Sequence, residues 1–455
     1  MVTASPGATG RGLRGDVPRS SHSSLQLPAE RDPVGTIIEQ NASRLQELVP
    51  IRNGRMAASP FAFFRGGAGI MAHDLAATPA SGLRTQLSGD AHLMNFGGFA
   101  SPERNLVFDL NDFDETLPGP FEWDVKRLAA SFEIAGRTRE FKRSERSAAA
   151  LESVRSYRDA MRRFAAMGDL DVWYAQLEAQ AVLETMQRAH DPKRVKELQR
   201  AVAKARRNDG RRALSSLTHE VDGERRIVSE PPLIVPLEEL GVDDAEQVLR
   251  PMLDSYLASL EPDRRVLTDR FRYADFARKV VGVGSVGTRC WIALLFGRDE
   301  NDPLFLQVKE ADPSVLEPLL GPSDTSSHGR RVVEGQRLMQ AASDIFLGWV
   351  QTDHELEGGH DFYVRQLRDW KASLDVETVT PRGLVDYATA CGWALARAHA
   401  RSGDRRAIAG YLGSGDQFDR AVAAFAEAYA GVNEEDHRAL VQAIADGRLQ
   451  ATAGI

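Results

Sequence analysis

The stretch Gly89–Glu115, GDAHLMNFGGFASPERNLVFDLNDFDE, gathers acidic residues and an asparagine around the short apolar run LVF. That run predicts a β-strand, so the polar residues lie at both ends of a short hairpin. Carboxylate and amide oxygens gathered in this way are the ligands that Mg²⁺ prefers. A solvated acidic turn is the alternative interpretation. The polar residues concerned are Asp90, His92, Asn95, Asp109, Asp112, Asp114 and Glu115.

Composition limits the class of protein. A chain of 455 residues, 42% of them hydrophobic, can bury a large core and form two or three domains or one two-lobed domain. The formal net charge of −8 argues against a general nucleic-acid-binding protein. Cys290 and Cys391 lack a metal-type spacing, so neither a zinc site nor a disulfide framework is predicted. Because no apolar segment is long enough to cross a bilayer, we expect a cytoplasmic protein without a transmembrane segment.

The changes in composition and periodicity along the chain predict an α+β fold. A Ser-, Gly-, Pro- and Arg-rich N-terminus is predicted to be disordered. The basic tract KRVKELQRAVAKARRNDGRR, residues 193–212, is predicted to be a solvated helical face, with a patch for an anionic partner as the alternative. The predicted parts are a disordered tail (1–32), a helical lobe with the acidic stretch (33–215), a linker hairpin and helix (216–259), an antiparallel sheet lobe (260–371) and a helical C-terminal part that packs on the helical lobe (372–455).

Helical spacing also predicts individual helices within these parts. They cover Phe61–Ala77, Ser144–Met167, Asp171–Arg207, Asp243–Leu260, Gln417–Tyr429 and Asn433–Asp446.

A second chemical signal lies in the predicted sheet lobe. Gly282, Gly284 and Gly287 form a GxGxxG pattern, which alone is weak evidence for a phosphate site. The next residues, TRCWIALLF, predict a strand, whereas a dinucleotide-binding fold would place a helix there. A further strand, LFLQVKEA, carries Lys309 near its end. A Gly-rich hairpin followed by a lysine on the next strand is the kinase arrangement, so we predict that this loop, with Ser285, and Lys309 bind nucleotide phosphates.

Two further residues are predicted to serve the nucleotide. The helix in RRVVEGQRLMQAASD carries Glu334, which we predict to pair with Lys309 and orient it; an exposed helical glutamate is the alternative. The segment FYVRQLRD is predicted to be the hinge strand, with its backbone near the adenine and Gln366 among the nucleotide-binding residues.

The spacing of Asp90 and Asn95 matches a kinase catalytic loop, D-x-x-x-x-N. Together, GDAHLMN and NDFDE resemble the HGDxHxxN and DFxD motifs of aminoglycoside and choline kinases. The resemblance implies that Asp90 orients the acceptor and that Asn95 and Asp112, with Asp114 in second rank, bind Mg²⁺. This chain has SGD where those kinases have HGD, so one supporting histidine is absent. His92 matches the second histidine and is predicted to be a structural hydrogen-bonding residue.

The resemblance extends beyond these motifs. WDVKRLA resembles the helix start of the same kinases and implies that Asp124 supports the catalytic loop, while Asp109 is a second-rank metal candidate. From about Pro33 to the C-terminus, phrases such as SPFAFFRG, FDLNDFDETLPGPFEWDVKRLAAS and VVEGQRLMQAASDIFLGW resemble the bacterial family known as domain of unknown function 2252. That family implies a kinase-like grouping and supplies no established substrate or reaction.

The order of the motifs differs from that of ordinary kinases, in which the Gly-rich hairpin precedes the catalytic loop. We therefore predict a two-lobed, protein-kinase-like fold that is circularly permuted. The predicted function is Mg²⁺-dependent transfer of a phosphoryl group from ATP, or another nucleotide, to a hydroxyl of an unidentified small molecule or protein. Nucleotide binding without turnover, as in a pseudokinase or scaffold, and nucleotidyl (AMP) transfer remain as alternatives. The prediction requires Lys309 and Asp112 to lie within the span of a nucleotide triphosphate.

Overall fold

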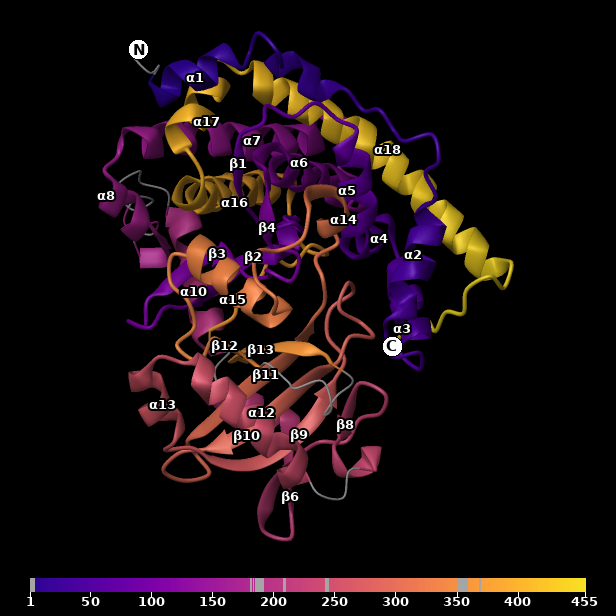
Figure 1. The fold of residues 1–455 in the computed structure, drawn as a ribbon, viewed down its shortest axis with the longest axis vertical. Helices are drawn as coiled ribbons and strands as arrows, with labels where there is room; N and C mark the ends of the chain where they lie inside the picture. The colour runs from indigo at the N-terminus through magenta and orange to yellow at the C-terminus, as the bar shows by residue number, and fades with distance from the viewer. Residues whose placement is uncertain are drawn as a thin grey trace.

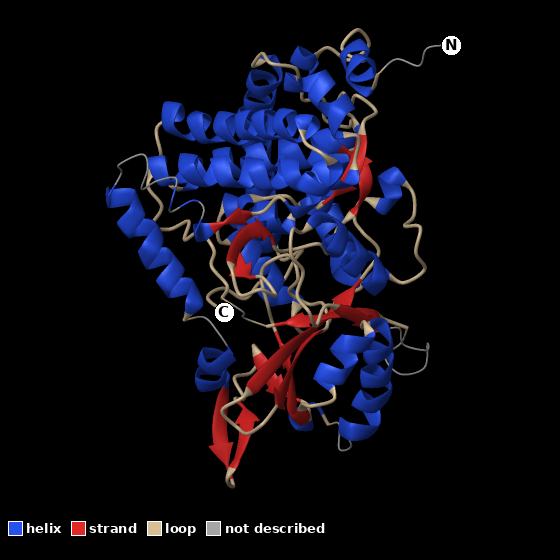
Figure 2. Cartoon of the chain, turned by 90° about the vertical axis from the view of Figure 1, so that its left-hand side faces the viewer, coloured by secondary structure: helices blue, strands red, loops and turns tan. Residues whose placement is uncertain are grey.

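Figures 1 and 2 show a helical part and a part built on a large sheet, and the chain is a mixed α+β protein with antiparallel sheets. This computed structural model describes residues 5–180, 182, 184, 192–207, 210–241, 245–350, 359–367 and 370–455. Among these residues, no helix combines the length and the apolar character that crossing a membrane would need.

Three long helices lie in the middle of the helical part, α6 (Phe121–Thr138), α7 (Arg143–Ala166) and α16 (Pro381–Ser402), and the long helix α18 (Gln417–Ala445) runs along its outer edge (Figure 1). Helices α7 and α16 approach closely at Gly392, where an added Cβ would lie 2.2 Å from the carbonyl oxygen of Ser153. The rings of Phe121 and Tyr157 stack in the core between α6 and α7, with their centroids 6.1 Å apart. This bundle buries the first residues of α6 and thereby holds the segment that the acidic stretch enters.

The N-terminal segment contradicts the predicted disordered tail. Helix α1 (Pro6–Gly12) packs on α17 (Arg405–Leu412), and an added Cβ at Gly10 would lie 1.9 Å from the carbonyl oxygen of Ala407. His22, in the 3-10 helix η1 (Arg19–Ser23), is buried and lies 2.6 Å from the hydroxyl of Tyr411. Small residues allow this close helix contact, and a composition rich in small and polar residues conceals it from a sequence-based prediction.

The large sheet has six antiparallel strands in the order β12 (Gly348–Val350), β13 (Asp361–Gln366), β11 (Pro303–Ala311), β10 (Cys290–Phe296), β9 (Arg272–Lys279) and β8 (Ile234–Pro236). All of β10 and nearly all of β11 are buried because apolar side chains cover both faces. Helix α12 (Ala245–Ser259) contributes to one covering cluster, and α11 (Gly210–Leu217) contributes to the other.

The described residues of the range 216–259 form the predicted hairpin and helix, but they are part of the sheet region and not a linker. The hairpin of β6 (Thr218–Val221) and β7 (Glu224–Ile227) turns at Asp222 and Gly223, whose φ values are 52° and 82°. Strand β8 extends the large sheet beside β9, and α12 packs on β12. The boundary between the two parts therefore lies before α11.

Four predicted helices have different limits. The predicted helix at 61–77 is divided at Gly67 into α4 (Pro60–Gly66) and α5 (Ala68–Ala76). The predicted long helix at 171–207 is replaced by α8 (Asp169–Tyr174), β5 (Leu177–Glu178) and α10 (Pro192–Arg206), and residues 181, 183 and 185–191 of that stretch lie outside the described residues. The two predicted C-terminal helices are one continuous helix, α18, which tolerates Gly431.

Short elements frame the acidic stretch, and they include the predicted strand LVF. Strand β1 (Arg84–Leu87) pairs with β4 (Leu117–Pro120), and β2 (Phe96–Ala100) pairs with β3 (Leu106–Leu110) after the 3-10 turn η2 (Leu93–Asn95). Both pairs are antiparallel, so the two ends of the stretch meet. The remaining helices are α2 (Pro33–Ala42), α3 (Val49–Ala57), η3 (Glu238–Leu240), α13 (Pro262–Thr268), α14 (Glu317–Leu320) and α15 (His328–Met339).

Candidate active site

A cavity of about 620 Å³ lies where the acidic stretch, the Gly-rich loop and the end of β11 meet. Its wall includes Asp90, Asn95 and Asp112 from the helical part. Gly282 and Gly284 line it from the loop between β9 and β10. Segments that are distant in the sequence therefore share one concave site, as an active site requires.

Asp124 holds the start of the catalytic loop in place. It is buried in the first turn of α6, and its two carboxylate oxygens accept hydrogen bonds from the backbone N–H groups of Ser88 (2.7 Å) and Gly89 (3.0 Å). The imidazole Nε2 of His399, on α16, lies 3.2 Å from the same carboxylate. Gly89 has φ of 79° and lies against the carbonyl of Glu115, so a side chain there would be strained and would clash.

Asp90 lies against a buried arginine on the helix that follows. Arg127 Nε donates to Asp90 Oδ1 over 2.7 Å, and His92 Nε2 lies 3.6 Å from Asp90 Oδ2. Burial raises the pKa of Asp90 to about 6, and the positive charge of Arg127 opposes that rise. His92 Nδ1 accepts the backbone N–H of Met94, and burial lowers the pKa of this imidazole. His92 is thus a neutral hydrogen-bonding residue beside Asp90.

Asn95 and Asp112 present oxygen atoms to the cavity. The amide nitrogen of Asn95 donates to the carbonyl of Asp90 over 2.7 Å, and among the described residues no hydrogen bond uses its amide oxygen. The backbone N–H of Asn111 donates to the Asn95 carbonyl over 2.8 Å, which links the two segments. The only basic group paired with Asp112 within the described ranges is Lys309, at 3.9 Å. Hard oxygen donors of this kind fit Mg²⁺.

Lys309 joins the sheet to these carboxylates. Its side chain is 3% exposed, and its ammonium lies between the carboxylates of Asp112 and Asp114. Tyr363, on the neighbouring strand β13, donates its hydroxyl to Asp114 Oδ1 over 2.7 Å. Burial alone would lower the pKa of Lys309, but Asp112 and Asp114 outweigh it and raise that pKa. Burial would likewise raise the pKa of Asp114, and Lys309 together with Tyr363 lowers it, so this is a charged pair.

The Gly-rich loop is anchored to the helical part. Val283 packs in an apolar cluster with Ile37 and Met56, and Val286 packs in another with Leu48 and Ile51. The loop positions Gly282, Gly284 and Ser285 on the cavity wall, where backbone groups can approach a ligand. Gly287 does not line the cavity: its φ is 91°, and its carbonyl accepts the N–H of Leu45 over 2.8 Å. Gly287 shapes the turn and anchors it to the helical part.

Glu334 does not pair with Lys309, which corrects one prediction. Its side chain is 49% exposed and forms an ion pair with Arg330 one turn earlier on α15, at 2.7 Å. Glu334 instead lines a different, shallower hollow near Leu117 and Arg331. The helix is correctly predicted, but its rotation about its own axis turns this glutamate toward solvent, and the carboxylates of NDFDE take its place at Lys309.

Asp109 and Gln366 also lie outside the main cavity. Asp109 is buried in an ion pair with Arg397 of α16 and accepts the backbone N–H of Ala341 over 2.8 Å, so its role is structural. Gln366 lines a second cavity of about 200 Å³ together with Asn111. The backbone N–H of Gln366 donates to Asp344, so it is not available to a base.

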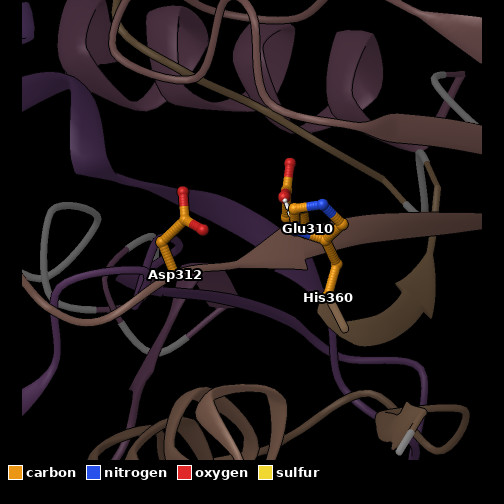
Figure 3. Close-up of side chains that lie close together, drawn as sticks. All are labelled: Glu310, Asp312 and His360. Carbon is orange, nitrogen blue, oxygen red and sulfur yellow. Dashed lines mark ion pairs between the residues drawn. The ribbon is translucent and has the colours of Figure 1, made fainter. Parts of the chain in front are cut away.

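Several residues of the site were not singled out from the sequence. Arg127 could have been predicted from the sequence, because it lies three residues after Asp124 and therefore on the same face of the helix. Glu310 and Asp312 line the main cavity, and with His360 they could hold a metal ion (Figure 3). Glu310 is already paired, since it accepts the backbone N–H of Arg289 over 2.7 Å and lies 2.6 Å from His360 Nδ1. We therefore interpret Glu310 as held by Arg289 and His360 at the cavity edge.

Comparison with known proteins places the chain in a family and not in a functional class. No curated protein and no solved structure matches it. The relationship to aminoglycoside and choline kinases stays a prediction. The bacterial family described as "Uncharacterized protein conserved in bacteria (DUF2252)" matches residues 44–443, and the resemblance to that family is confirmed. The chain belongs to this family.

Proposed function

We propose that the chain is a Mg²⁺-dependent phosphotransferase that moves the terminal phosphoryl group of ATP, or of another nucleotide, to a hydroxyl group. The observation that carries the proposal is the distance of 3.9 Å between Lys309 Nζ and Asp112 Oδ2. The two residues belong to different parts of the chain, and their motifs independently indicate phosphate binding for Lys309 and metal binding for Asp112. Their contact supports a single site built from both.

The proposal includes a permuted, kinase-like fold. The Gly-rich loop joins β9 to β10, and Lys309 lies on the next strand, β11, which is the order of these parts in kinases. The helical part would correspond to the kinase lobe that carries the catalytic loop. Asn111 lines the smaller cavity and the next residue, Asp112, lines the larger one, so one segment contributes to the walls of both. The base would occupy the smaller cavity and the phosphates the larger one.

Each residue then has a defined task. Asp90 would take the proton of the acceptor hydroxyl at Oδ2, the oxygen that Arg127 does not hold. The acceptor oxygen forms the new bond to phosphorus while the bond to the leaving diphosphate oxygen breaks. Asn95 and Asp112 would hold Mg²⁺, whose chemistry when bound is to neutralise phosphate charge. Lys309 would exchange one of its carboxylate contacts for a phosphate oxygen.

A second candidate function has its own supporting observation. The ammonium of Lys309 is held by Asp114, which also accepts the hydroxyl of Tyr363, and no glutamate on α15 orients the lysine. A nucleotide-binding protein without turnover would tolerate this arrangement. Transfer of AMP would use the same donors with the nucleotide bound in the opposite direction.

One experiment separates these functions. Purified protein is incubated with Mg²⁺ and ATP labelled at either the γ- or the α-phosphate, alone and with cell extract. Asp90→Ala and Asp112→Ala test the site, and Glu334→Gln is a matched control that removes a carboxylate from outside the cavity. Transfer of γ-label that both site variants abolish supports the proposal. Transfer of α-label supports AMP transfer, and binding without transfer supports the non-catalytic alternative.

A further inference from the structure

Three arginines form part of the wall of the main cavity. Arg44 follows α2, Arg52 lies on α3 and Arg65 lies on α4. None of the three forms an ion pair with a carboxylate of the described residues. In each of them the guanidinium Nε is buried and has no hydrogen-bond partner.

Arg52 differs from the other buried arginines of the chain. It is 1% exposed, and its guanidinium donates to the neutral side chains of Asn41 (2.6 Å) and Gln40 (2.9 Å). Every other fully buried arginine in the described ranges contacts a carboxylate: Arg127 with Asp90, Arg158 with Asp419, Arg331 with Glu317 and Arg397 with Asp109. A buried guanidinium without an opposing charge is costly, so Arg52 marks a place where an anion would be stabilising.

Arg65 extends this wall toward Asp90. Burial lowers its pKa, and the nearby carboxylates of Asp90 and Asp112 oppose that shift. Among the described residues, no hydrogen bond or ion pair uses its guanidinium. Arg44 completes the wall on the side of the Gly-rich loop, where it donates to the carbonyl of Val286 over 2.6 Å. Arg65 thus lies nearest to Asp90, Arg52 reaches the carbonyl of Gly66 next to Arg65, and Arg44 contacts the Gly-rich loop. Lys309 approaches from the sheet.

We propose that Arg44, Arg52 and Arg65 bind an anionic group of the acceptor, a phosphate or a carboxylate, beside the hydroxyl that Asp90 orients. This inference deepens the proposed function, and it rests on that function for the claim that the anion belongs to the acceptor. The existence of the anion subsite rests on the three arginines alone. A planar guanidinium suits phosphate and carboxylate oxygens, which it can bind through two parallel N–H groups. The substrate class is therefore an anionic alcohol, such as a phosphate ester or a hydroxy acid.

Isothermal titration of the full chain with inorganic phosphate tests the subsite, first without nucleotide and then with saturating Mg²⁺ and AMP-PNP. We expect phosphate to bind in both states. Arg65→Gln and Arg44→Gln should each weaken binding about tenfold or more, and Arg65→Lys should restore part of it. Arg330→Gln is the matched control, because it removes the same charge from a residue that does not line this cavity and should leave phosphate binding unchanged.

The other outcomes are decisive as well. Absence of phosphate binding, or equal weakening by Arg330→Gln, overturns the anion subsite. Competition between phosphate and Mg²⁺·AMP-PNP shows that the arginines hold the phosphates of the nucleotide and overturns their assignment to the acceptor. If AMP-PNP does not bind at all, the proposed function fails, and phosphate binding that depends on Arg65 still establishes the subsite. Because Arg52 is buried and its substitution could prevent folding, the half-buried Arg44 and Arg65 carry the test.

Discussion

Replacing Asp124 with alanine should destabilise the protein far more than the loss of an ordinary helix-capping aspartate. The carboxylate of Asp124 is 2% exposed and accepts the backbone N–H groups of Ser88 and Gly89. Alanine would leave both buried donors without partners, at about 1–3 kcal/mol each, or about 2–6 kcal/mol in total. Stabilities of folded proteins are about 5–15 kcal/mol, so this is a large fraction.

Urea unfolding, followed by circular dichroism and tryptophan fluorescence in parallel, measures the effect. Because the slope increases with chain length, it should be at least about 3 kcal/mol per molar urea here, and the midpoint should fall by at most about 0.7–2 M. Asp32→Ala is the matched control, because Asp32 also accepts a backbone N–H, from Gly35, but at an exposed helix start. Its loss should cost about 0.5–2 kcal/mol.

Asp124→Asn refines the test. The asparagine amide keeps one acceptor oxygen and turns an NH₂ group toward the second backbone donor. The urea midpoint of Asp124→Asn should therefore lie between those of the wild type and of Asp124→Ala. Equal midpoint shifts for Asp124→Ala and Asp32→Ala would refute the claim that Asp124 holds the catalytic loop.

Further outcomes follow from the same structure. Arg127→Met removes the positive charge that lowers the pKa of Asp90, so in a plot of the transfer rate against pH the midpoint assigned to Asp90 should move above about 6. Burial raises the pKa of Asp90 from 3.8 to about 6, so protonated Asp90 should stabilise the folded protein fully below pH 3.8, and this stabilisation should be lost as the pH rises through about 6. Asp90→Asn should abolish this dependence of the unfolding free energy on pH, measured by urea titration at several pH values. Asp112→Asn should abolish Mg²⁺-dependent binding of AMP-PNP in calorimetry, while Glu334→Gln should leave it within twofold of the wild type. Val286→Ala should cost about 1–3 kcal/mol by loss of apolar burial and should speed protease cleavage at residues 280–289; unchanged cleavage would argue against the docking of the Gly-rich loop.

Local patterns predicted the strands and the acidic hairpin correctly because their signals are short in range. Apolar runs such as CWIALLF and LFLQVKEA are buried on both faces, and their composition distinguishes them from the helices. The 3.9 Å contact of Lys309 with Asp112 agrees with an expectation built only on motif spacing. In these places, local propensity and tertiary structure favour the same conformation.

The errors concern properties that depend on long-range packing. Glu334 was assigned from its helix alone, but which face of a helix turns inward is decided by its packing partners. Asp109 was one of several acids in a hairpin, and only its distant partner Arg397 makes it structural. The buried state of Arg52 has no local signal, because its neighbours Asn41 and Gln40 come from another helix.

The balance of charges in the main cavity connects the two proposals. Asp90 and Asp114 are neutralised by protein cations, Arg127 and Lys309, so they need no ligand for compensation. Asp112 has to share the ammonium of Lys309 with Asp114, and Arg52 has no carboxylate partner among the described residues, so these two groups of opposite charge still lack full compensation. A simple anion would satisfy the arginine and leave the aspartate, and a lone cation would do the reverse. A divalent cation with a nucleotide, together with an anionic acceptor, would satisfy both, so the proposed phosphotransferase and the proposed anion subsite require the same set of charges.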